Sequence, residues 1–435
     1  MLLVEPLGHI GGHESAHTGY LVRALADAGV DVTLLTFEGR LGSSSELDAK
    51  VVNISFTSNE GMLVKIAGFL SHLFPAMFNR FHPDYMISTI CTFSRALKLS
   101  RKGKYQVIHI LDAYVPDYDF FFFASMIKHS NLVLTLYTPF RGAGLESRRL
   151  AFKDALSKGQ IRTSFQLWLS GLLETRLAVA FRWSLSRRAA RRNRLAFICY
   201  TKAVHDSFID SPFYDAIVPM FRGVVISKDY NLTKVEARRY LNLPQNETIF
   251  LHFGANHGFK NIKTIFQAFR SLHDDYKLLF AGKIDQAISH NNPEKLTQEY
   301  GLQQNVVIVN RYISDNEVQY FFCAADALVL SHRKDFKGAS GVLATAAQFD
   351  LPVITSDVGG AGEAVKNYNL GLTFQAENPL SLREAVSSFF ALSEEEKQEI
   401  KKNVSRFAQD HSWQLVAQKH IELYRGLMED KSTLR

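Results

Sequence analysis

In the first forty positions, apolar residues occur first in a continuous run, then at a helical spacing, and then in a second continuous run. Residues 2–7 and 30–37 are mainly apolar runs of strand length, and residues 15–29 between them carry apolar side chains at a helical spacing that ends at Gly29. A strand, a helix and a second strand in this order predict a βαβ unit and therefore a parallel sheet. Later runs of the same kind extend the predicted sheet, at 105–113, 131–140 and 194–201.

The same alternation begins again near residue 247. Apolar runs alternate with helical stretches, at 247–255, 277–284, 306–313, 326–332 and 351–358, and an amphipathic helix follows at 412–428. The periodicity is weak between the two halves. We therefore predict a first doubly wound domain over 1–212, a connecting region over 213–245, a second doubly wound domain over 246–410, and a C-terminal helix over 411–435 that packs back on the first domain.

Length and charge agree with two globular domains. A chain of 435 residues is too long for one core, and 46% hydrophobic with 21% charged residues is usual for a globular protein. The net charge of +7 favours anionic partners such as nucleotides, phosphates and acidic lipids. The three cysteines are scattered without a C-x-x-C pair, which argues against a disulfide framework or a zinc site. We expect no metal and no other cofactor.

The chain carries no run of about 18 apolar residues that would predict a membrane span. Its first residues already form an apolar strand, which leaves no room for a signal peptide. We therefore expect a cytoplasmic protein.

Glycine-containing loops follow several predicted strands. Gly8, Gly11 and Gly12 precede the first helix, whose N-terminus favours anions, although their spacing is not G-x-G-x-x-G. In the second half, Lys260 stands at a predicted helix start, where a lysine can meet a diphosphate. The loops 337–341 and 358–363 resemble anion-holding turns. Each loop alone also suits a tight turn, but the three loops of the second half converge at one sheet edge.

The order of these phrases resembles the retaining glycosyltransferases of the GT-B fold known as family four. The resemblance is strongest from residue 250 to 374, in FGANHGFKN, VVIVNRYISDNEVQYFFCAADALVLSH, GASGVLATAAQFDLPVITSDVGGAGEAV and GLTF, and GGHE extends it weakly towards the N-terminus. It implies an α/β chain of two Rossmann-like domains facing a cleft. It also implies a nucleotide-diphosphate sugar in the C-terminal domain, an acceptor mainly in the N-terminal domain, retention of anomeric configuration, and no bound metal.

The resemblance assigns roles to individual residues. Lys260 matches a diphosphate-binding lysine, Ile313 lies where the backbone contacts the base, and Gly12 matches a loop glycine at the donor. The phosphate and sugar loop falls on Ser340, Gly341 and Val342. Further candidates are Gly254, Asp335, Thr345 and Glu363 for the donor, Tyr137 and His109 for the acceptor side, and His13, Lys260 and Lys337 for catalysis.

The chain departs from the family at positions that matter. Glutamates are often found where this sequence has Lys337 and Thr345, an arginine where it has Ala255, and a histidine near Tyr137. Retaining transfer of this type does not require a protein nucleophile, because the leaving phosphate can accept the proton of the acceptor. Catalysis then depends on positioning and on stabilising the leaving diphosphate. A cation at residue 337 predicts a donor sugar with a negative charge, such as a uronic acid.

Two stretches combine apolar and basic residues. Residues 61–81 are apolar with basic interruptions, and residues 165–194 end in a cluster that includes Arg187, Arg188, Arg191 and Arg192. Leucine and aromatic residues beside arginines suit an anionic membrane surface. The alternative is a helix whose apolar face packs against the core and whose basic face is exposed to solvent. Nucleic acid is not expected, because no recognition motif accompanies the cluster.

These features predict a glycosyltransferase at the inner face of the membrane. It would move a sugar with retention from a nucleotide-diphosphate sugar to a glycan acceptor that is lipid-linked, in the assembly of a surface polysaccharide or glycolipid. Two alternatives remain: a catalytically inactive GT-B paralogue that acts as a binding or assembly partner, and another GT-B enzyme such as an epimerase or phosphorylase.

Overall fold

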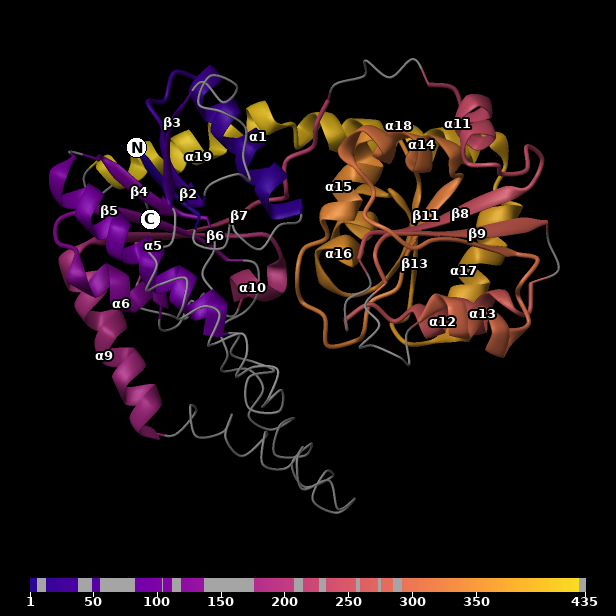
Figure 1. Ribbon diagram of the computed structural model, residues 1–435, viewed down its shortest axis with the longest axis horizontal. Helices are drawn as coiled ribbons and strands as arrows, with labels where there is room; N and C mark the ends of the chain where they lie inside the picture. Colours follow the sequence, from indigo (N-terminus) through magenta and orange to yellow (C-terminus); the bar gives the residue numbers. More distant parts are fainter. Residues whose placement is uncertain are drawn as a thin grey trace. The chain divides into compact units, whose positions relative to one another are not determined.

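The computed structural model describes residues 1–5, 13–37, 49–54, 83–103, 105–111, 119–136, 176–206, 214–226, 232–255, 259–272, 275–284 and 292–429. The chain divides into two compact units (Figure 1). The first contains Met1–Met220 and Val416–Arg435, and the second contains Phe221–Leu415. Each unit has a sheet of its own.

The first unit is built on a parallel sheet in the order β3-β2-β1-β4-β5-β6-β7. Its strands are Leu2–Val4 (β1), Thr33–Phe37 (β2), Lys50–Ile54 (β3), Val107–Ile110 (β4), Asn131–Leu136 (β5), Arg194–Cys199 (β6) and Ala216–Pro219 (β7). Its helices are His13–Asp27 (α1), Pro83–Lys102 (α5), Asp119–Met126 (α6), Arg176–Arg192 (α9), Lys202–Asp206 (α10) and the part of Trp413–Met428 (α19) that begins at Val416.

The two faces of this sheet are covered by different helices. Ile108 and Ile110 of β4 share one core with Phe93 of α5, Phe123 of α6 and Ala189 of α9. His109, between the two isoleucines, points to the opposite face because successive side chains of a strand alternate. There it contacts helix α19, as described below.

The second unit is built on a parallel sheet in the order β10-β9-β8-β11-β12-β13. Its strands are Thr248–Phe253 (β8), Tyr276–Ala281 (β9), Val306–Val309 (β10), Ala327–Leu330 (β11), Val353–Ser356 (β12) and Gly371–Phe374 (β13). Its helices are Lys234–Tyr240 (α11), Ile262–Phe269 (α12), Pro293–Tyr300 (α13), Asp315–Ala324 (α14), Gly341–Gln348 (α15), Gly359–Tyr368 (α16), Pro379–Ala391 (α17) and Glu394–Asp410 (α18).

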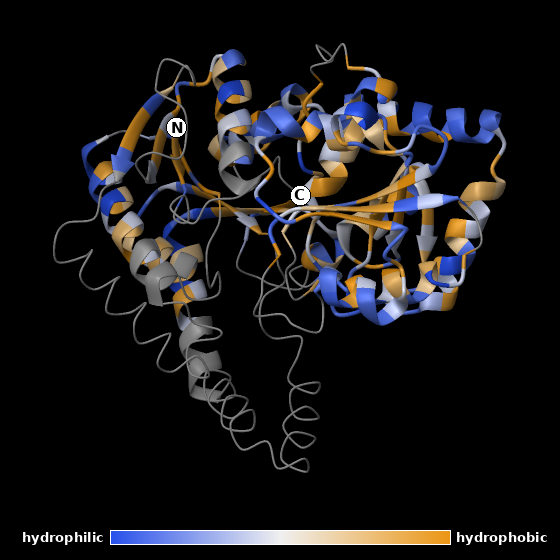
Figure 2. Ribbon diagram, turned by 45° about the vertical axis from the view of Figure 1, so that its right-hand side comes forward, coloured by the Kyte–Doolittle hydropathy of each residue, from blue (hydrophilic) through white to orange (hydrophobic). Residues whose placement is uncertain are grey.

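Helices lie on both faces of this second sheet. One core joins the sheet to α11, α14, α15, α16 and α18, and another joins it to α12, α13 and α17. Figure 2 shows the apolar strands in orange between helices whose outer faces are blue. In both sheets the strand order reverses beside the first strand of the unit, which is the doubly wound Rossmann arrangement. The predicted fold class, two Rossmann-like α/β domains, is therefore confirmed.

Two details refine the sequence reading. The stretch 213–245, predicted to connect the domains, contains strand β7 and helix α11. Helix α11 is preceded by its N-cap residue Thr233, whose side chain and that of Glu236 cap each other's backbone amides, so this segment is a regular element. Among the described residues no helix is long and apolar enough to cross a bilayer.

Candidate donor site

The carboxyl ends of β8 and β11 form the centre of the candidate site. These two strands are neighbours at the point where the strand order reverses, which is where ligands bind in open α/β sheets. The loops that follow them are joined by backbone contacts: Lys260 and His332 form an isolated antiparallel bridge, and the amide of Asn261 donates to the carbonyl of Ser331 at 2.8 Å.

Lys260 is buried at this edge of the sheet, with 7% of its surface exposed. Its Nζ donates to the carbonyl oxygen of Phe253, the last residue of β8, at 2.9 Å. A Cβ atom on Gly254 would stand 3.3 Å from this Nζ and 3.6 Å from Cγ2 of Val342, so the β8 loop, Lys260 and the start of α15 are close together. Burial lowers the pKa of Lys260 to about 7. An anion arriving here would therefore meet a cation that has little water around it.

Two buried histidines lie beside Lys260. His252 on β8 donates from Nδ1 to the carbonyl of Val329 at 2.9 Å, and His332 follows β11. Burial first, and the charge of Lys260 second, lower the pKa of each histidine to about 3, so both rings are neutral near pH 7. Nε2 of His252, Nδ1 of His332 and Oγ of Ser331 are buried and have no hydrogen-bond partner among the described residues. Such a concentration of unsatisfied polar atoms is expected where a bound group completes the hydrogen bonds.

Aromatic stacking holds the loops around these groups. The ring of His332 stacks on Phe336 with a centroid distance of 4.3 Å, and Phe336 stacks on Phe259 at 5.0 Å. Phe259 and Phe336 come from the loops that follow β8 and β11 respectively. The stack therefore fixes the backbone on both sides of Lys260 before any ligand is bound.

The N-termini of α15 and α16 open at the same edge. Neither Ser340, which precedes α15, nor Val358, which precedes α16, caps its helix with a side-chain hydrogen bond. No cap side chain therefore occupies the first amides of either helix, and helix dipoles favour negative charge there. Gly360 donates to the carbonyl of Gly338 at 3.0 Å, which joins the two loops. Gly359 has φ +63°, and a Cβ at this position would stand 2.8 Å from the same carbonyl.

The other predicted donor residues have varied surroundings. Ile313 is buried, whereas Lys337 is exposed on the loop between β11 and α15. The carboxylate of Asp335 accepts from Arg333 at 3.0 and 3.1 Å, so it is already engaged by a neighbour. The hydroxyl of Thr345 donates back to the carbonyl of Gly341 at 3.3 Å, within its own helix. Ala255 and Glu363 are half-buried.

Several residues were missed by the sequence reading. His252, Ser331 and His332 end strands in the phrases LHFG and LSHR, and a polar residue at the end of an otherwise apolar strand was the available signal. The glycosyltransferase resemblance drew attention to the following loops instead. The structure shows that the strand ends beneath those loops carry the buried basic groups.

Among the N-terminal candidates, Gly12 and Tyr137 lie outside the described residues, and so does the side chain of His13, at the first position of α1. His109 has a structural place instead of the predicted acceptor contact. It is fully buried, its Nδ1 lies 2.7 Å from Oη of Tyr424 on α19, and its Nε2 lies 2.8 Å from Oγ1 of Thr135. Burial and the nearby His420 hold the pKa of His109 well below its usual value. Both ring nitrogens are occupied, so none remains for an acceptor.

The arginine cluster divides in two. Arg187, Arg188 and Arg191 on α9 are exposed. Arg192 is half-buried and donates from Nη1 to the carbonyl of Ser125, near the end of α6, at 3.0 Å. Arg192 therefore joins two helices, and the three exposed arginines alone form the basic surface of this helix end.

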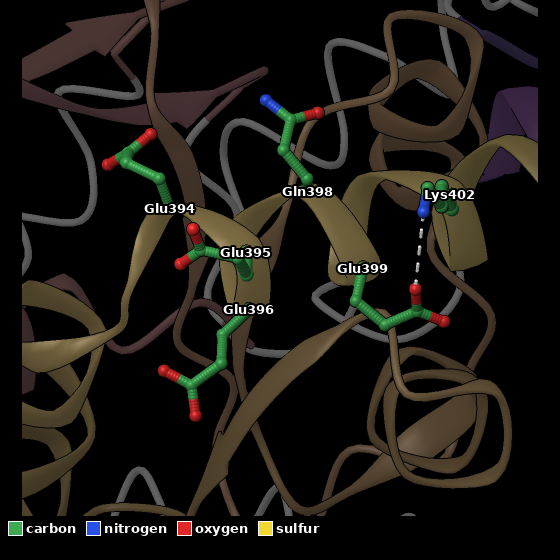
Figure 3. A pocket seen from close by; sticks show the side chains of 6 residues that line it. All are labelled: Glu394, Glu395, Glu396, Gln398, Glu399 and Lys402. Atoms are coloured by element: carbon green, nitrogen blue, oxygen red, sulfur yellow. Dashed lines mark ion pairs between the residues drawn. The ribbon is translucent and has the colours of Figure 1, made fainter.

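A surface depression elsewhere in the second unit has unsuitable chemistry for a diphosphate. It has a volume of about 570 Å³ and is lined by Glu394, Glu395, Glu396, Gln398, Glu399 and Lys402 at the start of α18 (Figure 3). Four carboxylates would repel an anion, and the one cation in the lining, Lys402, lies 3.7 Å from Glu399. The strand ends of β8 and β11 therefore remain the candidate donor site. Among the described residues no three His, Cys, Asp or Glu side chains are grouped as metal ligands would be.

The doubly wound sheet, the buried lysine and the two uncapped helix starts all lie within one segment of the chain. Residues 233–407 match the family model described as "Glycosyl transferases group 1". The second unit belongs to the group 1 glycosyl transferases. The family resemblance seen in the sequence is therefore confirmed over these residues, which include Lys260.

Known proteins extend this group 1 comparison. TuaC of Bacillus subtilis (strain 168), whose name assigns it to teichuronic acid biosynthesis, is 27% identical over 181 residues, which cover 41% of this chain and 42% of TuaC. The match thus spans less than half of that relative. A glycosyltransferase structure from Rickettsia africae ESF-5 covers 99% of this chain and 98% of its own, with a TM-score of 0.66 and 15% identity.

A third comparison is with Anabaena Alr3699/HepE in complex with UDP and glucose. The match covers 98% of this chain and 99% of the Alr3699/HepE chain, with a TM-score of 0.65 and 14% identity. At such identities these two structures establish the fold, which is GT-B as predicted.

Proposed function

We propose that this protein transfers a sugar from a nucleotide-diphosphate sugar to a glycan acceptor, with retention of anomeric configuration. The observation that carries the proposal is the buried Lys260 close to the start of α15, at the edge of the second sheet where the uncapped helices α15 and α16 both begin. A diphosphate placed there would meet one ammonium group and several backbone amides. The negative charge that develops as the sugar leaves would be stabilised by groups already in position.

The proposed reaction needs little covalent chemistry from the protein. The bond between the anomeric carbon and the diphosphate breaks, the acceptor hydroxyl attacks from the same face, and its proton passes to a phosphate oxygen. Lys260 and the helix amides stabilise the leaving diphosphate, and Ile313 lies where the base would contact the backbone. We expect neither a metal ion nor another cofactor to be required.

We further propose that the donor sugar is acidic. Lys337 is exposed on the loop between β11 and α15, at a position where the family resemblance expects an acid. A carboxylate on the sugar would pair with this lysine, whereas a neutral sugar would not. Teichuronic acid in the name of TuaC supports an acidic sugar as a candidate.

The setting that we propose is the cytoplasmic face of a membrane, in the assembly of a surface polysaccharide or glycolipid on a lipid-linked acceptor. Support comes from the exposed Arg187, Arg188 and Arg191 on α9, together with Phe122 and Met126 on the neighbouring helix α6, which are 54% and 46% exposed. Exposed cations beside exposed apolar side chains suit an anionic lipid surface.

A donor panel tests the proposal. Thermal shift and product analysis would compare nucleotide sugars that differ in base and in sugar charge, using the full chain. A donor at 100 times its dissociation constant should stabilise the protein by about 2.7 kcal/mol. We expect an acidic donor to bind more tightly than its neutral counterpart and to lose this advantage in Lys337→Met. Equal binding of both donors in the two proteins would contradict the acidic donor.

A non-catalytic role is the second candidate, and one observation favours it. The hydroxyl of Thr345 donates into its own helix, so the place where the family resemblance expects a ribose-binding acid carries a satisfied side chain. In that case a nucleotide sugar would bind without turnover, or no nucleotide sugar would bind. Release of sugar from the bound donor, to an acceptor or to water, would exclude this role.

A further inference from the structure

A stacked pair of tyrosines, of which Tyr240 is exposed and Tyr320 half-buried, lies on helices α11 and α14 of the second unit. Helices α11 and α14 contact each other, and the ring of Tyr240 stacks on that of Tyr320 with a centroid distance of 3.9 Å and an interplanar angle of 20°. Tyr240 is 52% exposed. The two rings line a depression of about 490 Å³, together with Leu232, Glu236, Arg239 and Gln319. Figure 1 labels both helices near the same edge of this unit.

The walls of this depression are held in place by buried contacts. Arg238 on α11 is 4% exposed, pairs with Asp326 at 2.6 Å, and donates to the carbonyl of Ala324 at the end of α14 at 3.0 Å. Lys234 on α11 pairs with the other oxygen of Asp326 at 2.6 Å. These bonds fix the relative position of the two helices, so the tyrosine pair is preformed. Binding to a preformed surface costs less conformational entropy.

The lining combines the features that a saccharide needs. A sugar ring has an apolar C–H face, which can lie on a tyrosine ring, whose face is electron-rich. Its rim carries hydroxyl groups, to which the guanidinium of Arg239 can donate and from which Oε1 of Gln319 and Oε1 of Glu236 can accept. The other polar atoms of Gln319 and Glu236 already bond to Asn316 and Thr233. The charges of Arg239 and Glu236 are opposite, so the lining does not select a polyanion or a polycation. The two tyrosines and one leucine, together with three polar side chains, offer both the apolar and the polar contacts that small-ligand sites combine.

We propose that the depression around Tyr240 and Tyr320 is a secondary saccharide-binding site, which holds the glycan part of the acceptor or product away from the donor loops. The choice of a saccharide rests on the proposed function, whereas the site itself rests on the α11 and α14 geometry. Such a site would raise the local concentration of acceptor chains without contacting the reacting atoms.

Saccharide binding by the full chain tests this proposal. The probes are maltotriose, cellotriose and tri-N-acetylchitotriose, followed by saturation-transfer NMR and calorimetry. We expect at least one probe to bind, with an affinity about tenfold lower in Tyr240→Ala, which corresponds to about 1.4 kcal/mol. Tyr240→Phe keeps the ring and should retain most of the binding. Leu380→Ala, at an exposed apolar position on α17, is the matched control and should have no effect.

The outcomes separate this site from the donor site. UDP and GDP binding should be unchanged in Tyr240→Ala. If neither nucleotide binds to wild type or to any variant, the proposed function is contradicted, but the saccharide measurement still tests the tyrosine site. The proposal is overturned if none of the three probes binds, or if binding is equal in wild type and Tyr240→Ala. It is also overturned if the substitution abolishes self-association in sedimentation instead, because the tyrosines would then be a protein interface.

Discussion

Burial of a lysine at the donor loops has a thermodynamic consequence. Lys260 has a pKa of about 7 in the folded protein and an ordinary value of 10.5 when exposed. Between these values the unfolded chain binds the proton that the folded chain has lost, so stability rises as the pH increases from 7 towards 10.5. The protein without ligand is therefore destabilised at neutral and lower pH by a group that we propose to bind the diphosphate.

Lys260→Met should remove this destabilisation. The substituted side chain is apolar and of similar length, so we expect the unliganded variant to be more stable than wild type at pH 6 to 7. The pH dependence of its stability above pH 7 should be smaller. Urea unfolding at pH 6 and pH 9 measures both effects. Equal pH dependence in the two proteins would show that Lys260 is charged throughout this range.

The two buried histidines affect stability in the same direction as Lys260, but over a lower range of pH. Their pKa values of about 3 lie below the ordinary 6.5, so they contribute stability that is present above pH 6.5 and is lost as the pH falls towards 3. His332→Phe keeps an aromatic ring that can stack on Phe336. We expect this variant to lose less stability than wild type between pH 6.5 and pH 4, as measured by urea unfolding. An identical loss would remove His332 as a cause of acid sensitivity.

At the level of elements, the α15 and α16 loops depend on close backbone approach. Gly359→Ala adds a Cβ that meets the Gly338 carbonyl at 2.8 Å, and it also requires φ +63°. We expect it to destabilise the protein by more than about 1 kcal/mol and to weaken nucleotide binding. Gly301→Ala is the control, because Gly301 has a similar φ of +69° but no atom within 4 Å of the added Cβ. A smaller loss at Gly359 than at Gly301 would contradict the packing argument.

Helix α9 carries a prediction of its own. Replacing Arg187, Arg188 and Arg191 with glutamine should reduce sedimentation with vesicles that contain anionic lipid, and added salt should reduce it in wild type. Arg192→Gln should instead lower stability, because it removes the bond to Ser125. The membrane proposal fails if wild type does not bind such vesicles at low salt.

For the whole molecule, alternating apolar runs and helical spacings were sufficient to predict two doubly wound sheets, since these patterns follow directly from burial. Lys260 and its glycine loop were also predicted, because a lysine at a helix start is visible in sequence. His109 was misassigned for a physical reason. A histidine in a sheet strand looks the same whether it faces a ligand or a helix, and the partner, Tyr424 on α19, lies 315 residues away in the chain.

The buried neighbours of Lys260 could not be predicted for a similar reason. His252 and His332 become buried, neutral rings only in the packed structure, where His332 also stacks on Phe336. The periodicity of each strand gives no measure of this burial. The sequence therefore indicated which loops form the candidate donor site, whereas the electrostatics of that site required the packed structure.

The measurement that tests the account most directly is calorimetric titration of UDP and GDP into wild type and Lys260→Ala. If Lys260 holds the diphosphate, at least one nucleotide binds to wild type, and the substitution weakens it by roughly 1.5–3 kcal/mol, the range for a hydrogen bond to a charged group. Unchanged affinity in Lys260→Ala, or no binding of either nucleotide to wild type, would contradict the assignment of the donor site.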